Sequence, residues 1–357
     1  MSIFGVKYRM NKLILISSIL LITLNALAAS SVGLGQAMVN PGFYEKPQWF
    51  KKSFLDLSVD LEEANAQGKK LILYFHQDGC PYCKKLLADN FTRKDIVSKM
   101  KKQFDLVEIN MWGDKQVTLL SGEELTEKNF ARKMKIMFTP TLVILDAQAK
   151  EQFRMNGYYD ADKFSAVLDF VFLAPAKAIA FNDFYLQQKN MSDKNNNSPL
   201  HREKFIVQSN DLASLIKQSN KPVMLLFEQD NCPQCTELHG DVFRRMPVYQ
   251  QLKQFTIAQI DINSESKIIS PKGQSMTEKE FAQSVNIQYT PSIFFYSKKS
   301  AGAEVFRSEA YLKGFHIQAL FAYILSGAYL SEPEFQRFVQ RRAEDMRKKG
   351  IKVDLWD

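Results

Sequence analysis

The sequence predicts an α/β protein made of two copies of one domain, each a small mixed sheet with helices on both faces. Length is the first reason, because 357 residues are too many for one typical domain. Self-similarity is the second, because a shift of about 151 or 152 residues aligns "ILYFHQDGCPYC" (72–83) with "MLLFEQDNCPQC" (224–235). The same comparison pairs "LTEKNFARKMKIMFTPTLVI" (125–144) with "MTEKEFAQSVNIQYTPSIFF" (276–295), and "FRMNGYY" (153–159) with "FRSEAYL" (306–312).

Each copy shows the same order of elements. A stretch with helical periodicity (48–67 and 210–219) precedes a short apolar run that predicts a buried central strand. The cysteine pair follows and starts a helix, with proline at its first position. Further strands and helices alternate after it. The four predicted strands of each copy are 71–75, 105–109, 141–145 and 151–155, and then 223–227, 256–262, 292–296 and 304–308.

Composition places boundaries around the two copies. We expect a signal peptide at 1–28, the first domain at 45–186, a polar linker rich in Asn and Ser at 187–202, the second domain at 203–330, and a helical extension at 331–357. One face of that extension is lined by Phe335, Phe338, Val339, Arg342 and Met346. It either docks on its own domain or makes a contact with a partner or the other domain.

The N-terminus indicates export. A basic start is followed by an apolar run and a small-x-small site at Ala26-Leu27-Ala28, which is typical of a cleavable secretory signal. An uncleaved anchor is the alternative, although the run is short for a span. After cleavage we expect no membrane insertion and a periplasmic or secreted protein. The net charge of +8 comes from basic residues spread among acids, so nucleic-acid binding is not indicated.

All four cysteines lie in two C-x-x-C pairs. Outside the cytoplasm, structural disulfides are common, but a bridge across three residues closes a tiny loop and stabilises little. A shared zinc site has the right number of ligands, but the two pairs lie far apart in the sequence and each belongs to its own copy. We therefore favour redox chemistry and expect no metal and no cofactor.

The helix start explains why these cysteines suit disulfide exchange. The nucleophile is a thiolate, which the free N–H groups and partial positive charge of a helix N-terminus stabilise. Cys80 and Cys232 occupy that position, so we predict that they attack. Cys83 and Cys235, one turn later, are then the resolving thiols that release the substrate from a mixed disulfide.

A Thr-Pro pair follows in each copy. A proline at the start of a strand can hold a cis peptide bond, and we expect one at Thr139-Pro140 and at Thr290-Pro291. Such a bond would turn the backbone toward the cysteines, where a substrate chain could bind as an added strand.

The strand, the C-P-x-C helix start in "LYFHQDGCPYCKKL" and the later Thr-Pro together resemble the thioredoxin fold, over roughly 45–180 and 203–330. The segment is most similar to thioredoxin-like proteins of the bacterial periplasm. The resemblance implies that both cysteine pairs are redox sites and that Pro140 and Pro291 help to dock substrates.

The sequence also departs from the thioredoxin pattern. The buried acid that thioredoxins have six residues before the first cysteine is replaced by Tyr74 and Leu226. His76 and Glu228, four residues before each first cysteine, are candidates for the proton relay; the alternative is that they point into solvent at a strand end. We expect the remaining histidines to be surface polar residues: His201, His239 and His316.

These features predict an exported thiol–disulfide oxidoreductase, a reductase or isomerase rather than an oxidase, that acts on protein thiols and disulfides and receives electrons from a membrane donor protein. One alternative is a non-catalytic thiol-binding, metal-binding or chaperone-like module, which bound metal without redox activity would identify. Another is a scaffold in which the second copy, with Gln234 in its tetrad, has lost activity.

Overall fold

The computed structural model describes residues 44–173, 180–192 and 199–353, and Tyr44–Asp357 form one compact unit. The predicted signal peptide at 1–28 lies outside the described residues. Among the residues described, no helix is both long enough and apolar enough to cross a membrane.

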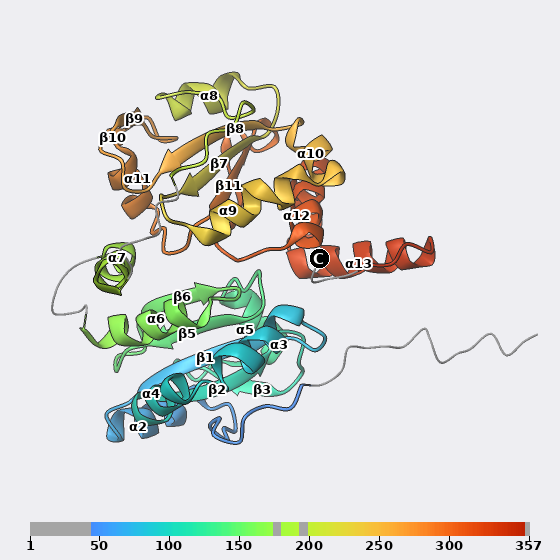
Figure 1. Cartoon of the computed structure of the whole chain (residues 1–357). Coiled ribbons are helices and arrows are strands. Elements are labelled where there is room, and N and C mark those ends of the chain that lie inside the picture. The colour runs from blue at the N-terminus through green and yellow to red at the C-terminus, as the bar shows by residue number, and fades with distance from the viewer. Residues whose placement is uncertain (1–43, 174–179, 193–198, 354–357) are drawn as a thin grey trace, which may run out of the picture. The chain divides into compact units, whose positions relative to one another are not determined.

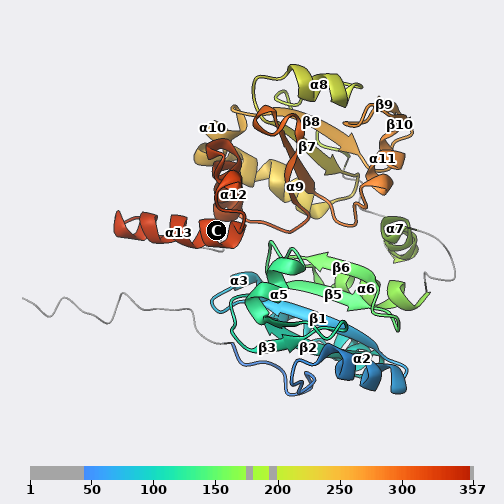
Figure 2. The same ribbon diagram turned by 180° about the vertical axis from the view of Figure 1, so that it is seen from behind.

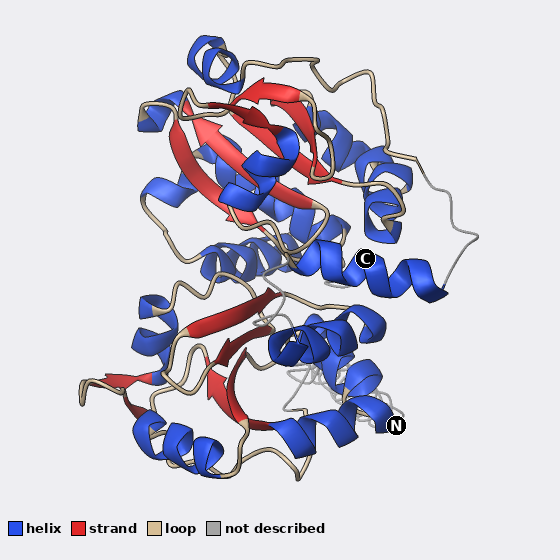
Figure 3. Ribbon diagram, turned by 90° about the vertical axis from the view of Figure 1, so that its left-hand side faces the viewer, coloured by secondary structure: helices blue, strands red, loops and turns tan. Residues whose placement is uncertain are grey.

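Two four-stranded mixed sheets confirm the predicted fold class (Figures 1 and 3). In the first repeat the strand order is β2-β1-β5-β6, where β1 runs parallel to β2 and antiparallel to β5. The second repeat has the matching order β8-β7-β11-β12. Their bounds are β1 Lys70–His76, β2 Phe104–Asn110, β5 Thr141–Leu145, β6 Glu151–Asn156, β7 Val223–Glu228, β8 Thr256–Asp261, β11 Ser292–Ser297 and β12 Ala303–Ser308.

Helices cover both faces of each sheet (Figures 1 and 2). In the first repeat α3, α4 and α6 supply the core on one face, and α2 and α5 supply it on the other. In the second repeat α9, α10 and α12 lie opposite α8 and α11 in the same way. Their bounds are α2 Leu57–Ala66, α3 Pro81–Lys85, α4 Lys94–Gln103, α5 Glu127–Lys133, α6 Ala161–Leu173, α8 Leu212–Gln218, α9 Pro233–Gly240, α10 Met246–Leu252, α11 Glu278–Ser284 and α12 Gly314–Ser326.

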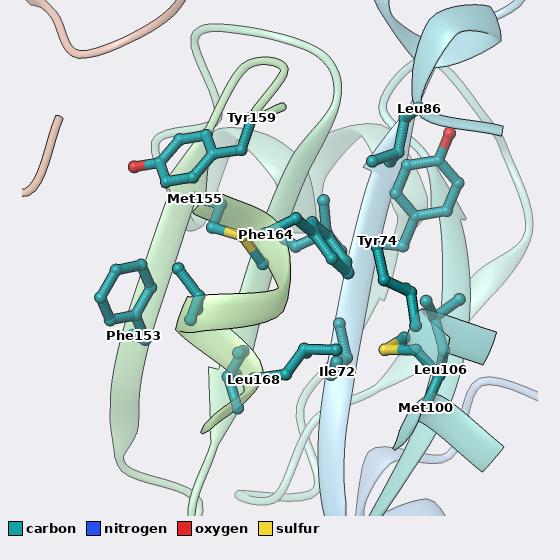
Figure 4. Packing of buried hydrophobic residues seen from close by; sticks show 14 of the residues in the cluster. Ile72, Tyr74, Leu86, Met100, Leu106, Phe153, Met155, Tyr159, Phe164 and Leu168 are labelled. Carbon is teal, nitrogen blue, oxygen red and sulfur yellow. The ribbon is translucent and has the colours of Figure 1, made fainter. Parts of the chain in front are cut away.

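The central strand β1 is buried on both faces. Successive side chains of a strand point to opposite sides, so Ile72 and Tyr74 enter one core while Leu73 and Phe75 enter the other. Figure 4 shows Ile72 and Tyr74 along β1, opposite Phe164 of α6. Burial on both faces explains the continuous apolar run that predicted the strand. The packed strand also holds in place the start of the loop that leads to Cys80.

Several elements differ from the sequence prediction. The helix expected at 48–67 begins only at Leu57, because the Asp56 side chain caps it by accepting hydrogen bonds from Ser58 N and Val59 N. The loop after β2 contains a small hairpin, β3 (Gln116–Thr118) with β4 (Glu124–Thr126), and the second repeat has the same hairpin in β9 (Lys267–Ile269) and β10 (Ser275–Thr277). Helix α7 (Phe181–Ser192) continues into the stretch predicted as linker.

The C-terminal extension forms helix α13, Phe335–Lys348, and its apolar face is buried as predicted. Phe335 packs against Phe306 and Tyr323 of the second repeat, with ring centroids 5.4 and 5.3 Å apart. It also packs against Phe138 of the first repeat at 5.6 Å. The helix therefore makes both of the contacts that the sequence left open.

Candidate active site

Both first cysteines are helix N-caps, as the sequence predicts. The Cys80 sulfur accepts a hydrogen bond from the Cys83 backbone N–H at 3.0 Å, and Pro81 occupies the first helical turn. In the second repeat Cys232 takes the same position, with 3.1 Å between its sulfur and the Cys235 nitrogen. Each sulfur thus lies at the positive end of a short helix, directly after the central strand.

Both Thr–Pro peptide bonds are cis, as expected. In the first repeat this loop lies against the Cys80 sulfur. The Thr139 hydroxyl donates to Cys80 Sγ at 3.3 Å, and the Thr139 carbonyl oxygen also lies 3.3 Å from that sulfur. The structure therefore brings together Cys80, Thr139 and Pro140, which are distant in the sequence.

The two cysteine pairs are in different states. Cys80 and Cys83 are free thiols, whereas Cys232 and Cys235 form a disulfide. The pairs are thus shown in the two forms between which a dithiol–disulfide cycle runs.

The environment distinguishes the two thiols of the first pair. Burial opposes ionisation of Cys80, but hydrogen bonds from Cys83 and Thr139 outweigh it and lower the Cys80 pKa below its ordinary value. Burial raises the pKa of Cys83 well above its ordinary value, and its neighbour Cys80 raises it further. This asymmetry is what an attacking and a resolving thiol require.

Tyr74 fills the position where a thioredoxin would have a buried acid. The side chain is fully buried, and burial together with the two cysteines raises its pKa well above the ordinary value. Its ring stacks on His76 at 5.5 Å. A neutral hydroxyl therefore replaces a carboxylate beneath the first cysteine pair, and Leu226 leaves the second repeat without either.

His76 does not point into solvent. It is 6% exposed, and its Nε2 lies 3.8 Å from Glu108. Burial lowers the His76 pKa to about 4, with help from the nearby Lys46 charge. At neutral pH its ring is thus uncharged.

Glu228 is also buried rather than exposed, and it belongs to a network that the sequence did not reveal. Its carboxylate oxygens lie 2.9 and 3.0 Å from His239 Nε2, and Gln259 donates to it at 2.6 Å. His239 lies one helical turn after Cys235 on α9, so the two share a helix face. The four-residue spacing between Cys235 and His239 was the sequence signal that could have predicted a role for His239 near the cysteine pair.

The prediction that His239 and His316 are surface residues is wrong. They are 1% and 6% exposed. A carboxylate partner allows His239 to be buried, and the Tyr82 hydroxyl, 3.2 Å from its Nδ1, does the same for His316.

The residues that the structure describes do not form a metal site. In the described ranges, no group of three or more His, Cys, Asp or Glu side chains is arranged to hold a metal ion. Each cysteine pair instead lies within its own repeat.

A buried cysteine pair at a helix start, facing a cis-proline loop at the start of an interior strand of a mixed sheet, defines a thioredoxin-fold site. The chain belongs to the thioredoxin-like domain family, whose sequence profile matches it twice, at residues 57–172 and 210–325. No curated protein matches the chain.

Several solved structures are similar to parts of the chain. A thioredoxin-fold protein from Helicobacter pylori is 15% identical, with a TM-score of 0.35, over 40% of this chain and 92% of that one. A thioredoxin from Thermus thermophilus is 22% identical, with a TM-score of 0.27, over 33% and 85%. A disulphide isomerase from Xylella fastidiosa Temecula1 is 13% identical, with a TM-score of 0.24, over 42% and 96%. The profile match, rather than these scores, carries the family assignment.

Proposed function

We propose that the protein is an exported thiol–disulfide oxidoreductase that acts on protein disulfides through Cys80–Cys83 and Cys232–Cys235. The observation that carries the proposal is the Cys80 sulfur, which sits at a helix N-cap, touches the cis Thr139–Pro140 loop, and has a lowered pKa. Thr290–Pro291 would serve the second repeat in the same way.

The reaction is a two-step exchange. The Cys80 thiolate attacks one sulfur of a substrate disulfide, forms a mixed disulfide, and displaces the other substrate sulfur as a thiolate. Cys83 then gives up its proton and attacks Cys80, which forms the Cys80–Cys83 disulfide and releases the second substrate thiolate. Two electrons pass from the protein to the substrate.

The resolving step needs a proton acceptor, because burial keeps Cys83 protonated. We assign the relay to His76 in the first repeat, and to Glu228 with His239 in the second, because each of these buried groups lies four residues from a cysteine of its pair.

We favour a reductase or isomerase, for which the dithiol is the active form, as it stands in Cys80 and Cys83. A reductase outside the cytoplasm needs a renewed supply of electrons, so a membrane electron-donor protein would be its partner. Export by the predicted signal at 1–28, to the periplasm or beyond, belongs to the same proposal.

Reduction of insulin tests the function. With excess dithiothreitol as electron donor, the full chain should accelerate precipitation of the insulin B chain over dithiothreitol alone. Replacing both Cys80 and Cys232 with Ser should remove the acceleration, and the two single variants show how much each repeat contributes. Unchanged insulin reduction by the folded double variant would contradict the proposal.

A further inference from the structure

Both attacking cysteines are almost completely buried, with Cys80 3% and Cys232 4% exposed. Residues of the second repeat cover the first site. The small cavity beside Cys80 is walled by Tyr311, Leu312 and His316, among others. A folded protein substrate could not bring its disulfide to Cys80 through that wall.

Tyr82, the variable residue of the first C-P-x-C, anchors this cover. Its hydroxyl accepts a hydrogen bond from the Lys313 backbone N–H at 2.8 Å and lies 3.2 Å from His316 Nδ1. The Tyr82 and His316 rings are 5.0 Å apart, and the tyrosine is 3% exposed. Tyr82, which directly precedes Cys83, is thus inserted into the other repeat.

The second site makes the equivalent contact in the opposite direction. Gln234 occupies the place of Tyr82, and its Nε2 donates to Asp160 Oδ2 at 3.1 Å. The alignment of "FRMNGYY" with "FRSEAYL" makes Asp160 the counterpart of Lys313. Each C-P-x-C therefore binds the same position of the other repeat.

Three counterpart pairs also meet one another directly. Asn156 Nδ2 lies 3.5 Å from Glu309 Oε2, and the Tyr158 and Tyr311 rings are 6.2 Å apart. Between them, a Cβ added to Gly157 would lie 2.7 Å from the Ala310 Cβ. Contact between equivalent residues is the signature of a two-fold, self-complementary interface. The two repeats therefore associate like the subunits of a symmetric dimer.

The residues just before each cis-proline bond also pack against the opposite repeat. Tyr289, which precedes Thr290, belongs to the core of the first repeat and packs on Tyr159 with ring centroids 4.9 Å apart. Its counterpart Phe138 belongs to the core of the second repeat and packs on Phe306 at 6.0 Å. Each loop proposed to receive a substrate strand is held by the other repeat.

Helices after each repeat complete the symmetry. Residues 181–184, "FNDF", open α7, and residues 335–338, "FQRF", open α13. Asn182 of α7 donates to the Ile287 carbonyl at 2.8 Å, and Gln336 of α13 donates to the Met137 carbonyl at 3.2 Å. Both acceptors lie just before the cis-proline loop of the opposite repeat.

We propose that the surface of each repeat that would receive a substrate is also the docking surface for the other repeat, so that the chain closes over its own cysteine pairs. A protein disulfide reaches Cys80 only after the repeats part. This proposal rests on the proposed function only where it takes the covered surface to be the substrate-binding surface. The contacts between the repeats that cover this surface do not depend on that function. Contacts between domains of one chain resemble those of transient complexes, and the hydrogen bonds made here by Tyr82, Gln234 and Gln336 can be exchanged for water on opening.

Alkylation of Cys80 tests the closure without requiring turnover. The reduced full chain is treated with a maleimide at fixed pH, and labelling of Cys80 is timed by mass spectrometry. Ala310→Phe inserts bulk against Gly157 at the centre of the interface, and the matched control Ala66→Phe places the same ring at an exposed position at the end of α2. His316→Ala is a milder opening variant that removes the Tyr82 contact without adding bulk.

Opening should raise the labelling rate of Cys80 roughly tenfold or more in Ala310→Phe, and to a smaller extent in His316→Ala, while Ala66→Phe matches the wild type. Circular dichroism and thermal unfolding identify the variants that remain folded. Equal rates in the wild type and both folded opening variants would overturn the closure. Faster labelling without any insulin reduction would support the closure and count against the proposed function alone.

Discussion

Cys80 shows how a few contacts can reverse the effect of burial on a thiol. An apolar surrounding alone would raise the pKa, as it does for Cys83. Cys80 differs because the Cys83 N–H and the Thr139 hydroxyl both point at its sulfur. The helix start could be predicted from Cys-Pro, whereas the hydroxyl contact depends on a loop that only the fold brings near.

The lowered pKa of His76 predicts that the stability of the protein depends on pH. In the unfolded chain its ring takes up a proton below its ordinary pKa of 6.5, but the folded protein resists protonation until about pH 4. The unfolded state therefore binds more protons between these values, and the folded state loses stability as pH falls from 6.5 toward 4, by roughly 3 kcal/mol at most for this residue.

Urea unfolding at pH 7 and pH 4.5 measures this effect. The free energy of unfolding should fall less between the two pH values in His76→Gln than in the wild type. His201→Gln, at a partly exposed histidine, should retain the wild-type difference. The same pH-dependent loss in His76→Gln and the wild type would contradict the buried, neutral state of this ring.

At the scale of elements, the two Thr-Glu-Lys helices provide an internal comparison. Thr277 caps α11 through a capping box, in which its hydroxyl accepts from Glu280 N and the Glu280 carboxylate accepts from Thr277 N. Thr126 has the same position before α5 but makes no side-chain cap hydrogen bond. Asn129 stands where Glu280 stands in the second repeat, which removes the returning carboxylate.

Alanine substitutions should therefore have unequal costs. Thr277→Ala is expected to lower the free energy of unfolding by about 1 kcal/mol, because it leaves a helix N–H without its partner. Thr126→Ala should cost less than about 0.5 kcal/mol, because its buried hydroxyl makes no hydrogen bond that the substitution would remove. Chemical denaturation of both variants checks this, and similar costs at the two sites would show that the cap has no role.

At the scale of the whole molecule, the repeat in the sequence was enough to predict both sheets. Each strand carried a local signal, such as the apolar run of β1 or the Thr-Pro before β5, and these local signals agree with the fold. The hairpins were missed, because three-residue strands carry too little periodicity to detect.

The interface between the repeats could not be predicted from these patterns. Tyr82, Gln234 and Asp160 are ordinary residues in sequence, and their role appears only when their partners from the other repeat are placed beside them. The contact of Phe335 with Phe138 could not be predicted either, because the apolar face of the C-terminal helix indicated a contact but not its partner. Contacts between domains lack the periodicity by which strands and helices can be found.

Trapping the Cys80 sulfur in a mixed disulfide tests the central claim, that Cys80 is the attacking thiol, most directly. A variant with Cys83, Cys232 and Cys235 all replaced by Ser keeps Cys80 alone, and oxidised glutathione is small enough to test the sulfur chemistry apart from protein docking. The reduced variant should form a mixed disulfide with one glutathione at Cys80 and release the other as a thiol, as intact mass spectrometry would show. In the same variant opened by Ala310→Phe, no gain of glutathione at Cys80 under conditions where an unfolded control reacts would contradict the assignment of Cys80 as the attacking thiol.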